Sequence, residues 1–239
     1  MKTVSSGCLT GWRICFCLIG ILTPVARPAI YYISKDGGEH CAGSDTPPYD
    51  TWAKAAISPK TVVDYVRSHG AGAVANIIYI DADTFASDDA IRLDHANHSA
   101  TILIGAGRGR TILSPSSHNA IYGSGASNIT VQDLTIRQVV ANAVYKESSA
   151  ADWTFQDVDF ESTRLGNGTL INLRGNTTRF LRCQFHHAAA SEDSYTVFMT
   201  GDAGATFVCC ISSPAVMGYQ SGQWYLGSSG ETEITNSIV

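Results

Sequence analysis

Apolar and polar residues alternate along short segments of this chain, and the alternation returns at a nearly constant interval. Segments 129–136 (ITVQDLTI) and 153–160 (WTFQDVDF) share one pattern, with a Gln-Asp pair between two apolar-polar-apolar triplets. Related segments follow at 178–185, 205–212 and 231–239. The equivalent apolar residues, Val131, Phe155, Phe180, Phe207 and Ile234, lie 24, 25, 27 and 27 residues apart. Such a fixed period is typical of a stack of equivalent structural units.

A second alternating segment precedes each copy by nine to eleven residues. These segments are NAIYGSG (119–125), NAVYKES (142–148), TLINLRG (169–175), YTVFMTG (195–201) and QWYLGSS (223–229). Alternation with a period of two, bounded by Gly, Ser and Asn, predicts strands joined by turns. Helical repeats need other apolar spacings, and no leucine-rich framework is present. We therefore predict a solenoid whose strands pair in parallel from coil to coil.

The segment before the repeats adds a helix. Residues 30–56 contain an aromatic-rich strand, a Gly/Asp loop and a Pro-x-x-Thr-aromatic step. Ser58 and Pro59 then begin a predicted helix that has three valines on one face and ends at Gly70. Together with the repeats, these features resemble the right-handed parallel β-helix superfamily, with its pectate-lyase-like fold. The resemblance implies an all-β, right-handed parallel β-helix of about six to seven coils with an N-terminal capping helix, but no particular reaction.

We expect three segments along the chain. Residues 1–29 have basic residues before a short apolar run (ICFCLIGILT), as a secretory signal does, with an uncleaved anchor as the alternative. The run is shorter than the roughly 20 residues that span a bilayer, so no membrane span is expected after removal of the signal. Residues 30–75 form the first strand and capping helix, and residues 76–239 form the coils. The protein is therefore expected outside the cell or on its surface.

The sequence stops on a repeat strand. We expect either that further coils follow in a longer protein, or that the uncapped C-terminal coil associates with a partner.

Net charge bears on which ligands the protein binds, and the cysteines bear on zinc sites and disulfides. A formal net charge of -5 argues against nucleic acid, which is usually bound by a basic surface.

Four cysteines follow the expected signal, and none has zinc-site spacing. They are Cys41, Cys183, Cys209 and Cys210. Cys183 and Cys210 occupy one inward position of successive coils, where they pack as small hydrophobic residues or form a cross-coil disulfide.

Four sequons for glycosylation occur, and they would carry sugar only in a eukaryotic secretory pathway. They begin at Asn97, Asn128, Asn167 and Asn176.

The Asp of the repeated phrase marks a corner of the coil, because Asp and Asn tolerate the left-handed backbone of a sharp bend. The corner series is Asp133, Asp157, Arg182, Cys209 and Asn236. Coils lie about 4.8 Å apart, so Asp133 and Asp157 are stacked like charges. Arg182 is the expected counter-charge. A Ca²⁺ ion on the two aspartates is the alternative, suggested by family resemblance only, and no other cofactor is evident.

Two kinds of sugar chemistry can be sought on the strand faces. A glycoside hydrolase needs clustered carboxylates, but Asp159 stands alone between Thr135 and Gln184 of the neighbouring coils. A lyase acting on acidic sugars needs a base and a neutralising cation, for which Lys146 and Arg174 are the candidates. The alternative is a surface ion pair between Glu147 and Arg174.

Three other segments are weaker candidates. His186-His187 predicts an exposed turn, with a general base or metal ligand as the alternative. His95 and His98 have the spacing of metal ligands, yet no Cys or matching carboxylate follows them. The Gly-rich GAGRGRT segment (105–111) lacks the Lys-Ser/Thr of a phosphate loop and is interpreted as a link between strands.

Two functional hypotheses follow. The first is a secreted β-helix protein that binds or processes acidic polysaccharide, as a lyase or glycoside hydrolase if it is an enzyme. The second is a non-catalytic surface, adhesion or structural module.

Overall fold

The computed structural model describes most of the chain after residue 26. The described ranges are 27–35, 38–40, 43–70, 75–86, 91–116, 119–138, 141–162, 169–187, 195–214 and 223–238. Most of the expected signal lies outside them, as do Cys41 and Asn167.

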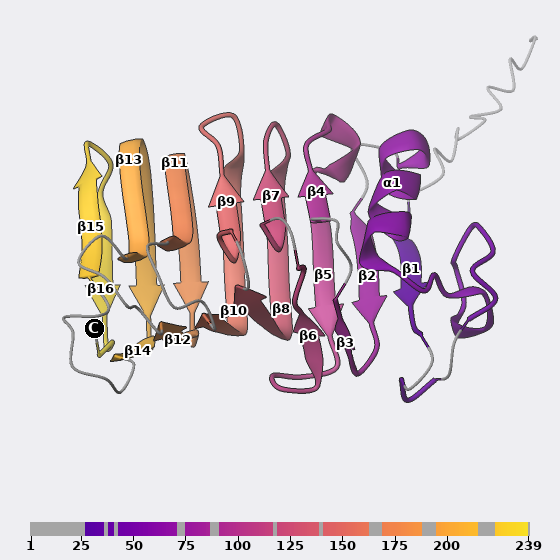
Figure 1. Cartoon of the computed structure of the whole chain (residues 1–239). Coiled ribbons are helices and arrows are strands. Elements are labelled where there is room, and N and C mark those ends of the chain that lie inside the picture. Colours follow the sequence, from indigo (N-terminus) through magenta and orange to yellow (C-terminus); the bar gives the residue numbers. More distant parts are fainter. Residues whose placement is uncertain are drawn as a thin grey trace, which may run out of the picture.

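Strands stack along one axis and pair in parallel, as the repeats predict (Figure 1). The first sheet contains β1 (Ala29–Ile33), β2 (Asn76–Ile80), β5 (Thr101–Gly105), β8 (Ser127–Gln138), β10 (Ala151–Ser162), β11 (Thr169–Leu181), β13 (Tyr195–Val208) and β16 (Thr232–Thr235). Phe155 pairs with Val131 on one side and Phe180 on the other, and Phe207 continues the row to Ile234. The register inferred from the repeats is therefore confirmed.

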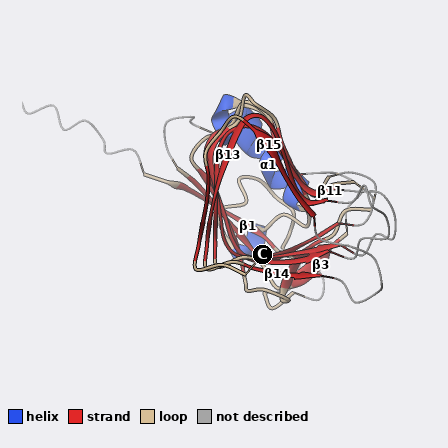
Figure 2. Cartoon of the chain, turned by 90° about the vertical axis from the view of Figure 1, so that its left-hand side faces the viewer, coloured by secondary structure: helices blue, strands red, loops and turns tan. Residues whose placement is uncertain are grey.

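Two further sheets complete each coil, and the longest strands bend from one sheet into the next (Figure 2). The second contains β3 (Asp83–Phe85), β6 (Thr111–Leu113), the second halves of β8 and β10, β12 (Gln184–His187) and β14 (Ile211–Pro214). The third contains β4 (Ile91–Leu93), β7 (Ile121–Gly123), β9 (Val144–Lys146), the first halves of β11 and β13, and β15 (Gln223–Ser228). Six strands stacked in the third sheet correspond to about five turns.

The core consists of inward side chains that stack from coil to coil. The rings of Phe155 and Phe180 lie 5.3 Å apart, and those of Phe180 and Phe207 lie 4.8 Å apart. A second row runs from Phe160 to Phe185, with centroids 5.2 Å apart. All five rings are fully buried. Stacked aromatic rings combine large apolar burial with favourable ring geometry, which explains why the repeat keeps an aromatic residue at these positions.

Helix α1 (Pro59–His69) covers the N-terminal end of the stack, with Val62, Val63 and Val66 buried against the first coils. A short 3-10 helix, η1 (Trp52–Lys54), precedes α1 in the chain, and another, η2 (Ala96–His98), contacts α1 through His98. No helix among the described residues is long and apolar enough to cross a membrane.

The corners have left-handed backbone. The expected series has φ values between 49° and 57° at every member, including Arg182 and Cys209. A second series precedes the first-sheet strands and was not recognised in the sequence. It consists of Ala100, Asn128, Asp152 and Asn176, with φ between 54° and 58°.

Apolar side chains are exposed at the last described coil. Leu226 and Ile234 are 38% and 45% exposed, although their equivalents in the preceding coil, Met199 and Phe207, are buried. Ile238 is 68% exposed at an outward position. Association through this end remains a prediction.

Candidate functional site

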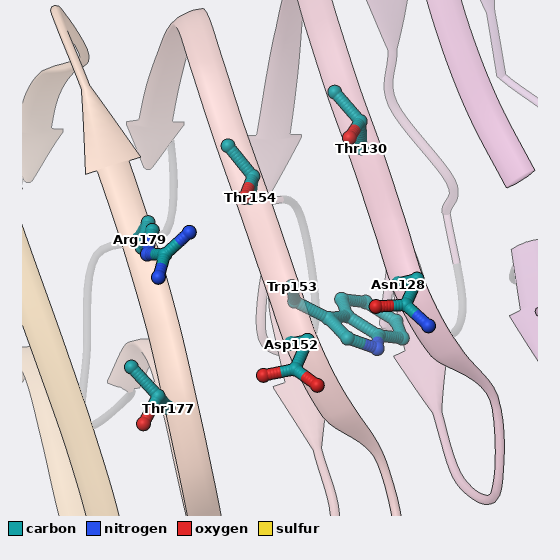
Figure 3. A pocket seen from close by; sticks show the side chains of 7 residues that line it. All are labelled: Asn128, Thr130, Asp152, Trp153, Thr154, Thr177 and Arg179. Atoms are coloured by element: carbon teal, nitrogen blue, oxygen red, sulfur yellow. The ribbon is translucent and has the colours of Figure 1, made fainter. Parts of the chain in front are cut away.

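A groove lies on the outer face of the first sheet, where β8, β10 and β11 run side by side (Figure 3). Its volume is about 190 Å³. The lining residues are Asn128, Thr130, Asp152, Trp153, Thr154, Thr177 and Arg179. The ring of Trp153 is buried, and the other six lining residues are polar.

Strand pairing arranges the polar side chains in rows across the strands. Thr130, Thr154 and Arg179 pair directly, so they form one row along the stack axis. Asn128 and Asp152 lie two residues earlier on their strands, at the left-handed corner, and are exposed. Neighbouring strands are about 4.8 Å apart, so each row presents one polar group per coil to an extended ligand.

The groove contains one cation and one carboxylate. Arg179 and Asp152 are both exposed. Neither forms an ion pair with another side chain within the described ranges. The planar guanidinium of arginine matches a carboxylate with two parallel hydrogen bonds, so Arg179 is free to bind an acidic ligand.

A second hollow of about 190 Å³ adjoins the groove and shares Thr177 with it. Its acidic lining residues are Asp202, Glu231 and Glu233. The outer face of the first sheet therefore changes along its length, from hydroxyl groups with one arginine to a region rich in carboxylates.

Lys146, a candidate catalytic base, lies inside the coil rather than on its surface. Its side chain is fully buried, and Nζ donates hydrogen bonds to the carbonyl oxygens of Gly175 at 2.5 Å and Asn176 at 3.3 Å. Burial lowers the pKa of Lys146 to about 8, against the opposing effect of the Asp202 and Asp152 carboxylates. The alternation in β9 contains this signal, because Val144 points inward and Lys146 lies two residues later.

Arg174, the second catalytic candidate, is exposed and stacks on Tyr145, with Cζ 5.0 Å from the ring centroid. The structure therefore does not bring Lys146 and Arg174 to one face. The alternative ion pair with Glu147 is also not formed, since Glu147 accepts a hydrogen bond from the hydroxyl of Tyr122 at 2.8 Å. An external sugar cannot reach Nζ of Lys146 in this arrangement.

Asp133 and Asp157, the candidate metal ligands, are engaged in side-chain hydrogen bonds at the corner. Asp157 accepts two hydrogen bonds from Arg182, at 2.9 and 2.5 Å. These bonds hold the pKa of Asp157 below its usual value. Asp133 accepts a hydrogen bond from the amide of Gln132 at 3.1 Å. In the part of the chain that the structure describes, no three His, Cys, Asp or Glu side chains converge on a metal position.

The outer face of the second sheet carries two carboxylates rather than one. Asp159 pairs with Thr135 and Gln184 as expected, but Glu161 projects from the same side of β10 two residues later. Arg108 lies 3.2 Å from Asp159, and Arg137 lies 2.8 Å from Glu161. Each carboxylate therefore already has a cationic partner.

The Gly-rich segment at 105–111 lies over this second sheet, since the backbone N–H of Gly109 donates to the hydroxyl of Thr135 at 2.9 Å. Arg108 belongs to the same segment. The segment is a link between strands, as interpreted from the sequence, and it also places Arg108 beside Asp159, two coils away.

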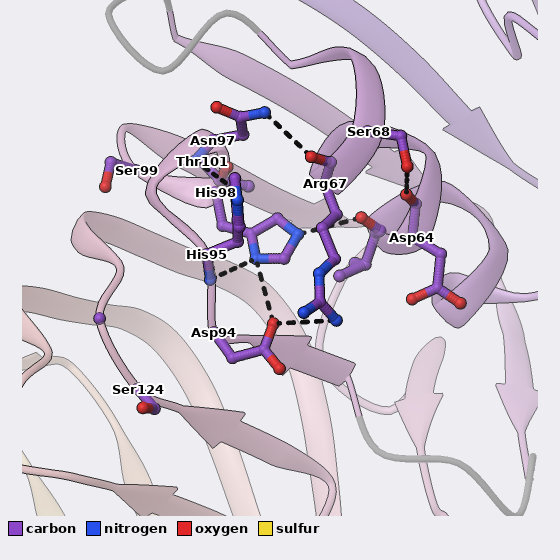
Figure 4. A network of polar contacts seen from close by, with 12 residues as sticks. Asp64, Arg67, Ser68, Asp94, His95, Asn97, His98, Ser99, Thr101 and Ser124 are labelled. Carbon is purple, nitrogen blue, oxygen red and sulfur yellow. Dashed lines mark hydrogen bonds and ion pairs between the residues drawn. The ribbon is translucent and has the colours of Figure 1, made fainter.

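His95 and His98 serve as caps for η2 rather than converging on a shared ligand (Figure 4). Nδ1 of His95 accepts from the backbone N–H of Asn97, and Nδ1 of His98 accepts from that of His95. His98 also donates from Nε2 to the carbonyl of Val63 at 3.0 Å, which ties the first coil to α1. Burial lowers the pKa of His98.

The other weak candidates have local partners. The His186 side chain is exposed, and its Nε2 lies 3.3 Å from Oε1 of Gln184. The amide of Asn97 donates to the carbonyl of Arg67, and that of Asn176 donates to backbone carbonyls of the preceding coil. Asn128 is the exposed sequon residue in the groove.

Cys183 and Cys210 are buried free thiols whose Sγ atoms donate to the carbonyl oxygens of Phe155 and Phe180, at 3.4 and 3.3 Å. Packing as small side chains at one inward position therefore describes them, and no disulfide joins them in this structure. Cys209 is exposed and free.

The fold is similar to that of a pectin methylesterase mutant solved in complex with a hexasaccharide. The TM-score is 0.53 at 18% sequence identity, and the match covers 86% of this chain and 66% of the other. A second pectin methylesterase complex with a hexasaccharide has a TM-score of 0.47 at 14% identity, covering 87% and 78% of the two chains. No protein-family model and no curated protein sequence matches the chain. The first of these two structures, together with the stacked parallel strands, places the chain in the right-handed parallel β-helix fold class.

Proposed function

We propose that the protein binds an acidic polysaccharide in the groove over β8, β10 and β11. The observation that carries the proposal is Arg179, an exposed guanidinium that has no carboxylate partner among the described residues. It lies in a groove lined mostly by hydroxyl and amide groups. Arginine is suited to the carboxylate of an acidic sugar, and the threonine row offers hydrogen bonds to its hydroxyl groups. The pectin methylesterase with a similar fold, which was solved with a hexasaccharide, supports a saccharide ligand.

The polysaccharide would lie along the stack axis. Thr130, Thr154 and Arg179 present polar groups in that direction, one per coil. The carboxylates of the adjoining hollow would repel an acidic chain, so its path is expected to extend from Arg179 toward β8 rather than toward β16.

Processing of the polysaccharide would depend on Asp152, the carboxylate that shares the groove with Arg179. A single carboxylate can act as a base or nucleophile next to a cation that orients the substrate. A non-catalytic surface module is the second candidate function. It is favoured by the pairing of Asp159 and Glu161 with arginines, which leaves the second sheet without free carboxylates at these positions.

Calorimetric titration with a hexamer of galacturonic acid tests the binding proposal. Arg179→Gln should weaken binding about 10- to 100-fold, because a hydrogen bond to a charged group contributes about 1.5–3 kcal/mol. Arg110→Gln is the matched control, since Arg110 is exposed on a distant loop and pairs with Glu39. A neutral galactose hexamer should bind weakly to both. No change in either the affinity or the number of acidic hexamers bound between wild type and Arg179→Gln would contradict the proposal.

An assay for product release from a long acidic polysaccharide separates the two functions. Loss of product with Asp152→Asn, while binding persists, would support processing. Binding by the wild type without product would support the non-catalytic module.

Export from the cell is part of the proposal and is supported by the basic and apolar pattern of residues 1–29. Expression of the full chain in a secreting host, followed by N-terminal sequencing of protein in the medium, tests it. A mature end near residue 27–30 is expected, and retention of Met1 on intracellular protein would contradict export.

A further inference from the structure

The outer face of the third sheet carries aromatic side chains at one position of successive strands. Tyr122 on β7 pairs with Tyr145 on β9, and Asn172 then links Tyr145 to Phe198 on β13. Phe198 stacks on Tyr225 of β15 at 4.8 Å. These outward rings are partly exposed, in contrast to the buried phenylalanine rows of the core.

Two arginines enclose the N-terminal part of this series. The rings of Tyr122 and Tyr145 are stacked, with centroids 5.8 Å apart and planes at 9°. The guanidinium of Arg92 lies over Tyr122 at 5.1 Å, and that of Arg174 lies over Tyr145 at 5.0 Å. We call these four residues the arginine–tyrosine ladder.

The two arginines of the ladder have no carboxylate partner among the described residues, whereas Arg67, Arg110 and Arg182 each pair with an Asp or Glu. Glu147 is the nearby acid on this face, and its carboxylate accepts from the hydroxyl of Tyr122. Stacking on a ring fixes the guanidinium plane and leaves its N–H groups at the edge available for an anion. The ladder therefore presents two oriented cations with aromatic surface between them.

We infer that the arginine–tyrosine ladder is a second binding surface for an acidic saccharide chain, on a face separate from the groove. Charge complementarity favours carboxylates as ligands, because both cations are unpaired and planar. Tyrosine and arginine are also the side chains that contribute most to binding surfaces, since each combines apolar area with polar groups. Nucleic acid is a poorer fit, because the chain has a net charge of -5 and only two free cations lie in the ladder.

The corner between the third and first sheets separates the two surfaces. Arg174 precedes the corner at Gly175 and Asn176, and Arg179 follows it on the groove side. Residues of one strand, β11, therefore contribute a cation to each surface. A chain bound at one surface would leave the other accessible, so two separate ligands are expected at saturation.

Calorimetric titration of the full-length protein with a hexamer of galacturonic acid can resolve the two surfaces. The double variant Arg92→Gln/Arg174→Gln removes the cations of the ladder, Arg179→Gln removes that of the groove, and Arg110→Gln is the control for loss of charge. The wild type and the control should bind two hexamers per chain, and each of the other proteins should bind one. Arg174→Lys keeps the charge without the planar fork, so affinity at the ladder should fall about tenfold.

The outcomes separate the inference from the proposed function. Wild-type stoichiometry and affinity in the ladder variant would overturn the inference, even if Arg179→Gln removes the groove site. Loss of binding in the ladder variant alone would support the ladder and contradict the groove. Absence of binding by the wild type would contradict both. Because Arg92 and Arg174 are exposed, unchanged melting temperatures are expected and would exclude misfolding as the cause.

Discussion

The two halves of β10 differ in whether the charged side chains around them have partners. On the first half, Asp152 and Thr154 face a groove in which Arg179 has no carboxylate partner within the described part of the chain. On the second half, Asp159 and Glu161 are each paired with an arginine from another coil. The same strand thus carries one face whose charges stabilise the stack and one face whose charges are available for a ligand. Both faces carry charged side chains, and the faces differ in whether those charges form ion pairs.

The largest expected effect is that of replacing Lys146, because its amine is a charge buried inside the coil. Its pKa is about 8 in the folded protein and about 10.5 when unfolded. Between these values the unfolded state binds more protons, so the free energy of unfolding should rise with pH, by about 3 kcal/mol in total from this group. Denaturant unfolding between pH 7.5 and 10.5 should show this rise in wild type and not in Lys146→Met.

Parallel pH curves for wild type and Lys146→Met would contradict the burial of the charged amine. Near neutral pH the variant loses the donor to the carbonyls of Gly175 and Asn176 but no longer buries a charge, so these two effects on the free energy of unfolding oppose each other. Ser148→Ala, at an exposed position of the preceding corner, provides a control for local substitution.

Replacing one arginine by glutamine on each face of β10 tests the difference between the two faces directly. Arg179→Gln should weaken binding of an acidic hexamer about 10- to 100-fold and leave the melting temperature unchanged. Arg137→Gln should leave binding unchanged and lower the free energy of unfolding by about 0.2–1 kcal/mol, as expected for a half-exposed ion pair. If both variants lose binding equally, the groove is not the distinguishing feature.

Removing the Arg182–Asp157 pair is expected to have a smaller effect, on the stability of the protein at acidic pH. Because Arg182 depresses the pKa of Asp157 in the folded state, the pair stabilises the protein above the unfolded pKa and stops doing so as the pH falls through the folded pKa. Asp157→Asn should therefore show less loss of stability than wild type during acid titration below about pH 4. Identical acid curves, measured by circular dichroism, would indicate that the pair contributes nothing.

The fold followed from the sequence because one position per repeat has to be buried in every coil. The row from Val131 to Ile234 defined both the period and the register, and the corner series was found from the break in alternation at Asp133. The second corner series at Asn128 and Asp152 was missed, because it lies where a strand begins and no break in alternation marks it.

The site was less predictable, since it depends on which charges find partners. Alternation alone places Lys146 inside, but its polar character favoured a surface interpretation. Arg108 reaches Asp159 across 51 residues, and no local pattern reveals such a contact. Arg179 was overlooked because an arginine on a strand is ordinary. It becomes a candidate only when the contacts of the described residues leave it without a carboxylate partner.

A crystal structure of the protein with a hexamer of galacturonic acid tests the central claim most directly. We expect the hexamer to cross β8, β10 and β11 along the stack axis, with one carboxylate hydrogen-bonded to the guanidinium of Arg179. A hexamer bound over the Asp159 and Glu161 face, or a groove that stays empty in crystals saturated with the hexamer, would contradict the claim.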